Sequence, residues 1–197
     1  MRKLPNYLPL NNEKVSVLIL KDFNKLNNVY KHTVAASNGA CKLIAITEDY
    51  LAKPKRAAEA LKEEAIHYFD QITGFSMRHD VKNAAIPLLN DDERMDTIEE
   101  LSHTIRPGKN PIRKYDEISH IPELLVEYFF IRDYLQSQAE RSGSFLSRIK
   151  NRHKEAASTV TAEMEKMFGP DYCALCSNFE EKLRQQAVAQ SLSTTTA

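Results

Sequence analysis

Apolar residues recur along most of this chain at the spacing of an amphipathic helix. Asn11 or Asn12 can cap a first helix with this pattern. Its apolar side comprises Val15, Leu18, Ile19, Phe23, Leu26, Val29 and Tyr30. Asn38–Gly39 is a typical helix stop, because glycine adopts the left-handed conformation easily. The run CKLIAI (41–46) could be a buried strand, but no other segment is an evident partner strand, so we predict a short helix there.

The middle of the chain predicts two clear helices and a shorter one. Pro54 can occupy a first helical turn, so we expect a helix from there to about Ile72, with Gly74 ending it. A short helix follows and breaks at Pro87. Asn90 and Glu93 have the spacing of a capping box, which predicts a helix from there to about residue 105.

A loop rich in proline and basic residues, RPGKNPIRKYDE (106–117), separates these helices from three long ones. Pro122 begins the first, Ser144 can cap the second, which ends at Gly169–Pro170, and the third runs from about Asp171 to Gln190. The last residues, SLSTTTA, have almost nothing to bury and predict a disordered tail over 191–197. We therefore predict an all-α fold, a single domain of six to seven helices over residues 1–190.

The helix near 122–141 is the most apolar and should be the centre of the domain. One stripe comprises Leu124, Leu125, Tyr128, Ile131 and Leu135, and a second comprises Val126, Phe130 and Tyr134. A helix apolar on two sides is either the domain centre or buries its second side on a partner. Glu127 lies between the stripes, and we expect it to reach solvent or to pair with a lysine or arginine, since buried glutamate is rare without a partner.

Composition agrees with a helical protein and narrows the classes of function. Glycine is scarce and tryptophan absent, while the 27 basic and 27 acidic residues cancel, so no global charge draws the chain to nucleic acid. Three cysteines do not form a disulfide framework. VSVLIL (15–20) is too short for a signal-peptide core or a membrane span, so we expect a cytoplasmic protein or one secreted without a cleavable signal peptide.

Three Glu-x-x-His pairs have the spacing found in ferritin-like diiron proteins, in which such pairs point into a helical bundle. Glu100 and His103 lie about 150° from the apolar stripe of their helix, so we expect both to be exposed. His67 turns away from the stripe that Glu64 flanks. The third pair, residues 117 and 120, precedes Pro122 and need not share a regular helix. We therefore expect no metal or other cofactor, although a metal-dependent helical enzyme remains an alternative.

Cys173 and Cys176 form a Cys-x-x-Cys near a helix start, where the helix dipole can lower a thiol pKa. This motif resembles the helical carboxymuconolactone decarboxylase and alkylhydroperoxidase D group, which implies a possible thiol-redox site. That family places a proton-relaying histidine on the same helix, whereas this chain has Glu180 there. Cys176 also falls on an apolar stripe with Phe179, which favours a packing role.

Arg148 and His153 match the Arg-x4-His spacing of HEPN ribonucleases, which are also helical. The resemblance implies a ribonuclease as a second alternative. Ile149 follows the arginine, whereas the family usually has a polar residue there. Because His153 lies beside an apolar stripe, a partly buried structural histidine is the simpler interpretation.

No catalytic group of residues emerges from these patterns, so we expect a non-enzymatic protein-interaction domain: an adaptor, a chaperone-like subunit or an effector-type component of a larger assembly. Helical surfaces and the basic loop would then bind another protein. The candidate partner-binding residues are Arg106, Lys109, Arg113, Lys114, Val126, Phe130 and Tyr134.

Overall fold

The computed structural model describes residues 15–21, 35–143 and 151–194. Their contacts group into two compact units, one assigned to Met1–Phe75 with Phe179–Ala197 and the other to Ser76–Asn178. Most of the described residues are helical, as predicted, but the first unit contains a small β-sheet. The all-α prediction is therefore correct for the bulk of the fold and wrong for this part.

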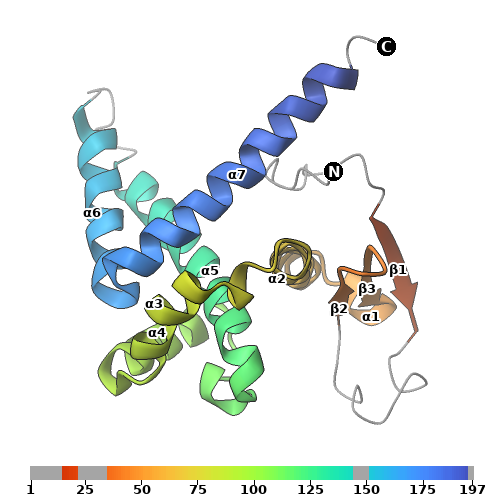
Figure 1. The fold of residues 1–197 in the computed structure, drawn as a ribbon, viewed down its shortest axis with the longest axis horizontal. Helices are drawn as coiled ribbons and strands as arrows, with labels where there is room; N and C mark the ends of the chain where they lie inside the picture. The colour runs from red at the N-terminus through yellow and green to blue at the C-terminus, as the bar shows by residue number, and fades with distance from the viewer. Residues whose placement is uncertain (1–14, 22–34, 144–150, 195–197) are drawn as a thin grey trace. The chain divides into compact units, whose positions relative to one another are not determined.

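The sheet has three strands, which Figure 1 shows as arrows: β1 (Ser16–Leu20), β2 (Ala35–Asn38) and β3 (Leu43–Thr47). Their spatial order is β1-β3-β2. β3 is the central strand, parallel to β1 and antiparallel to β2. Among the described strands, β1 therefore has only one neighbour and leaves its other edge unpaired.

β1 and β3 replace the first two helices that the sequence predicted. The expected helix over 15–30 is wrong at residues 16–20, where consecutive apolar and β-branched residues favour an extended chain; residues 22–34 lie outside the described part. The CKLIAI segment is also a strand rather than a short helix. This strand, β3, pairs with β1 on one side and β2 on the other, and neither partner was evident from the sequence.

The turn between β2 and β3 explains the Asn38–Gly39 signal, which marks a hairpin rather than a helix end. The side chain of Asn38 accepts a hydrogen bond from the N–H of Cys41 at 2.9 Å, which folds the turn back. Gly39 donates its N–H to the Gln71 side chain at 2.6 Å. A Cβ at position 39 would lie 2.9 Å from Gln71 Cβ, so only glycine allows the turn to approach this neighbouring segment so closely.

The hairpin packs against a long helix, α2 (Pro54–Thr73), which follows the single-turn helix α1 (Glu48–Leu51). Pro54 begins α2 and Gly74 ends it in the left-handed conformation, with φ +63°, both as predicted. Ile46 of β3 packs with two small residues of α2, whose short side chains let the helix lie close to the sheet. The apolar cluster at this contact comprises Ala35, Ile46, Ala57 and Ala60, with Tyr50 and Leu61 packed against it.

The second unit is built from helices. A short 3-10 segment, η2 (Phe75–Met77), spans the division between the units and is followed by α3 (His79–Leu89) and α4 (Asp92–Ile105). After the short η3 (Ile112–Lys114) come α5 (Glu117–Gly143), α6 (Asn151–Phe168) and α7 (Pro170–Thr194), whose later part is assigned to the first unit. None of the described helices is long and apolar enough to cross a membrane.

Several helix ends differ from the predicted ones for local reasons. Asp91, rather than Asn90, caps α4 by accepting a hydrogen bond from the N–H of Arg94. α5 begins at Glu117 rather than Pro122, because Asp116 accepts the N–H of Ser119 at 2.9 Å and caps an earlier turn. Ser144, the expected cap of α6, lies outside the described residues, and α7 extends into the segment where we predicted a disordered tail.

α5 is the central element of the second unit, as predicted, and packs against α3, α4, η3 and α6. Every residue from Glu123 to Ile131 is buried, so the helix is enclosed on all sides along this stretch. Tyr128 contacts Phe168 and Tyr172 edge to face, with ring centroids 5.3 and 6.2 Å apart. These aromatic contacts join α5 to the end of α6 and the start of α7.

Candidate interaction site

The basic loop that follows α4 directs its first charged side chain into the protein. Arg106 and Glu127 of α5 form an ion pair in which the side chains are only 6% and 2% exposed. The guanidinium also lies over the ring of Phe130, 4.0 Å from its centroid. Arg106 therefore neutralises a buried carboxylate, and the prediction that Glu127 pairs with a basic residue is confirmed.

The second cation of the loop is also used within the unit. Lys109 Nζ lies 3.0 Å from a carboxylate oxygen of Glu123, which is buried one turn before Glu127 on α5. The same ammonium lies 5.5 Å from the ring centroid of Tyr115. Two successive acidic positions of the central helix are thus matched by two basic residues of one loop, which ties the loop to α5.

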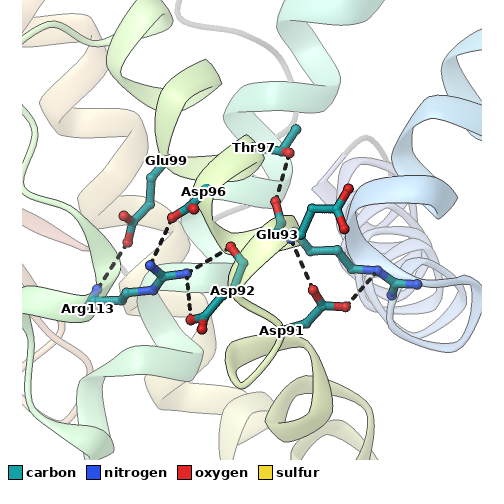
Figure 2. Close-up of polar contacts among 8 residues, drawn as sticks. Asp91, Asp92, Glu93, Asp96, Thr97, Glu99 and Arg113 are labelled. Carbon is teal, nitrogen blue, oxygen red and sulfur yellow. Dashed lines mark hydrogen bonds and ion pairs between the residues drawn. The ribbon is translucent and has the colours of Figure 1, made fainter.

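Arg113 ties the far end of the loop to α4, as Figure 2 shows. Its Nη1 donates to Asp96 at 2.9 Å and its Nη2 to the main-chain oxygen of Asp92 at 3.1 Å. Its own N–H donates to Glu99 at 3.3 Å. These contacts lie at the surface, where a single ion pair contributes little, but together they fix the course of the loop. Lys114, next along, is exposed.

The second apolar stripe of α5 is largely covered in the structure. Val126 and Phe130 are buried, whereas Tyr134 is half-buried. Of the seven residues that the sequence singled out for partner binding, those on α5 therefore contribute to the interior of the protein more than to an open surface. The basic ones, apart from Lys114, make ion pairs inside the second unit.

The Cys-x-x-Cys thiols lie in the interior near the start of α7. Cys173 and Cys176 are both buried. Burial, with a smaller effect from nearby Glu165, raises the pKa of Cys173 to about 12. Burial likewise raises the pKa of Cys176 well above its ordinary value. The environment therefore opposes the thiolate that redox chemistry requires and outweighs the helix dipole.

The three Glu-x-x-His pairs do not share one environment. Glu100 and His103 are both exposed on α4, which confirms the prediction made from the stripe of that helix. Glu64 and His67 are half-buried on α2. Glu117 and His120 share a helix, because α5 begins before Pro122. The Nε2 atom of His120 lies 2.7 Å from the carbonyl oxygen of Tyr115.

The side chains of the Arg-x4-His candidate are not described by the structure. Arg148 lies outside the described residues, and His153 belongs to α6 but its side chain is not described. The ribonuclease hypothesis thus stays a prediction from sequence.

An exposed apolar strand is the surface feature that sequence reasoning missed. Val17, Leu18 and Ile19 of β1 are 58%, 44% and 50% exposed, although each is large and apolar. The hydrogen bond from the Ser16 N–H to the Lys42 carbonyl oxygen, 2.9 Å long, directs Ser16 toward β3. Because main-chain groups alternate along a strand, those of Val17 and Ile19 point to the unpaired edge. The apolar run VLIL was visible in the sequence, but it belongs to a longer pattern with helical spacing, so we predicted a helix there and not an edge strand.

Comparison with known proteins adds no family to this picture: no family model, curated protein or solved structure matches the chain.

Proposed function

We propose that this chain is a non-enzymatic protein-interaction domain that receives an extended segment of a partner protein along β1. The observation that carries the proposal is the edge strand β1, with three consecutive large apolar side chains exposed. An exposed apolar strand edge costs a protein solubility and invites pairing with another chain. A partner strand would cover it and satisfy its main-chain groups.

The chemistry of β1 defines the segment that would fit. Residues 16–20, SVLIL, carry no charge, so the incoming strand meets apolar side chains on both faces of the sheet. Main-chain hydrogen bonds to Val17 and Ile19 would provide affinity that does not depend on sequence. Partner segments that place apolar or β-branched side chains beside Val17, Leu18 and Ile19 would bind more tightly than segments with polar side chains there. The expected partner is therefore a protein that offers a short, uncharged, extended segment.

The surfaces first considered support a binding role less well. The basic loop and the second stripe of α5 are used for contacts inside the second unit, as described above. The buried thiols likewise give little support to the redox alternative. The proposal accordingly moves the binding surface from the helices to the sheet.

A defined peptide tests the proposal. The probe is a fluorescein-labelled heptapeptide of threonine, valine and isoleucine with a lysine at each end, and binding is followed by fluorescence polarisation. Its control carries proline at the centre, which cannot donate to a strand pair. We expect the first peptide to bind the wild-type protein and the proline peptide to bind at least about tenfold more weakly, because it loses central main-chain hydrogen bonds.

Matched protein variants locate the binding. Lysine is a residue that blunts natural sheet edges, so V17K/I19K should abolish peptide binding. Ile118 is 84% exposed on α5 and provides the control I118K, which should bind like wild type. Equal binding of the two peptides, or binding that survives V17K/I19K, would contradict the proposal.

A further inference from the structure

We infer that the strand received by β1 is β1 of a second copy of this chain, so that the protein forms a symmetric dimer through an antiparallel β1–β1 pair. This inference rests on the proposed function, because it names the partner of the same edge. The partner must offer a strand that is apolar on both faces and uncharged, and β1 itself has both properties.

In an antiparallel β1–β1 pair, each face of the strand lies beside the same face of the other copy, and both faces are apolar. Val17 and Ile19 pair in the sheet with Ile44 and Ile46, so they lie on the face that α2 covers, while Leu18 lies on the opposite face. In an antiparallel pair with its two-fold axis at Leu18, Val17 of one copy lies opposite Ile19 of the other. The two copies of Leu18 meet on the other face. Each exposed apolar side chain thus gains an apolar cross-strand neighbour.

The main-chain groups fit the same register. Val17 and Ile19 present their N–H and C=O groups to the open edge, so each Val17–Ile19 pair can exchange two hydrogen bonds, about four in the dimer. Leu18 directs its main-chain groups toward β3 and so forms the non-hydrogen-bonded pair at the axis. With the axis at Leu18, the centre of the strand, each of the five residues of β1 lies opposite a residue of β1 in the other copy.

Charge favours the antiparallel direction. Lys21, exposed directly after β1, lies at opposite ends of an antiparallel pair, with the two copies about 20 Å apart along the strands. A parallel pair would bring the two ammonium groups side by side, where like charges repel. A two-fold antiparallel contact also occupies the β1 edge in both copies, so assembly through this edge stops at the dimer.

The contact is small, which sets the expected strength. A single pair of five-residue strands buries less than the roughly 1,200 Å² of a stable interface, so we expect a dissociation constant in the micromolar range or weaker. The dimer should therefore form and dissociate within the concentration range of ordinary sedimentation experiments.

Sedimentation equilibrium across this range is the first test. The average mass should rise with concentration from 22.5 kDa to a plateau at twice that value. V17K/I19K should stay monomeric and I118K should behave as wild type, with circular dichroism confirming that both variants are folded. A mass that rises without a plateau, or a dimer that survives V17K/I19K, would overturn the β1 pair.

Cysteine cross-linking tests the register separately. In a C41S background, which removes the exposed cysteine, L18C places two thiols at the axis, where Cα atoms about 4.5 Å apart suit a disulfide. S16C lies on the same strand and face, but its symmetry mates are about 14 Å apart. We expect at least about tenfold more disulfide dimer from L18C than from S16C under mild oxidation, since only the first pair fits disulfide geometry. Equal yields would refute this register.

The outcomes separate the two proposals. If the wild type stays monomeric at every concentration but binds the apolar heptapeptide through β1, the dimer is wrong and the proposed function stands. If the wild type neither dimerises nor binds the peptide, both are wrong.

Discussion

The ion pair between Arg106 and Glu127 provides a stringent test of how the second unit is held together. The variant R106M keeps a flexible apolar side chain over Phe130 but leaves Glu127 with a buried charge and no cation. Both side chains of the pair are almost completely buried, and Glu127 Oε2 already lacks a hydrogen-bond partner among the residues that the structure describes. Removing one partner of such a pair costs about 3–5 kcal/mol, because the remaining charge stays out of water.

Removing Glu127 instead of Arg106 should lower the free energy of unfolding by a smaller amount. E127M leaves the guanidinium, which makes further contacts and can extend its long stem toward solvent. The double variant R106M/E127M removes both charges and should lie within about 1 kcal/mol of wild type, since apolar replacements of a buried pair are often neutral. The two single costs together exceed the cost of the double variant by about 3–5 kcal/mol, which is the coupling free energy expected between positions 106 and 127.

Urea unfolding followed by circular dichroism at neutral pH measures these differences. Asp96→Asn is the control, because it removes an exposed ion pair with Arg113 and should cost less than about 1 kcal/mol. If R106M and E127M each cost less than about 1 kcal/mol and their effects simply add, the two groups are solvated and the reasoning is wrong.

Three further predictions concern the thiols, a helix end and alkaline pH. In the folded protein Ellman's reagent should modify Cys41 rapidly and the buried Cys173 and Cys176 only after urea is added; rapid modification of all three would contradict their burial. Gly74→Ala should lower the free energy of unfolding by about 1–2 kcal/mol, measured in urea, because alanine resists a φ of +63° although space for its Cβ is open. Burial raises the pKa of Tyr128 from 10.0 to about 12, so its favourable contribution is complete below pH 10 and is lost as the pH rises toward 12. Tyr128→Phe should therefore make the loss of stability over this pH range shallower in urea titrations, and an unchanged slope would exclude this cause.

The helices could be predicted where their signals are local. Pro54 and Gly74 delimit α2 because each acts through its own backbone conformation, which depends little on the rest of the fold. The outward positions of Glu100 and His103 follow from the spacing of Met95 and Ile98, which pack inward on the same helix.

The strands and the basic loop could not be predicted because their causes are non-local. β3 is a strand because β1 and β2 lie on either side of it, yet one partner had helical spacing and the other, AASN, contains no β-branched residue. Arg106 turns inward because Glu127, 21 residues away, is buried on α5. Before the fold is known, nothing near Arg106 in the sequence distinguishes it from Lys114, which is exposed.

The order of the strands also has a consequence for the protein as it is being synthesised. β1 leaves the ribosome first, but its neighbour in the sheet is β3, and β2 lies between them in sequence. β2 and β3 can form their hairpin as soon as both have emerged, because a short turn joins them, whereas β1 must dock afterwards onto the completed hairpin. Until then SVLIL is an unpaired apolar segment of a nascent chain, which is the kind of segment that aggregates unless a chaperone covers it. Slower translation after β1 has emerged from the ribosome, but before β3 has emerged, should therefore prolong that exposure and increase aggregation on the ribosome.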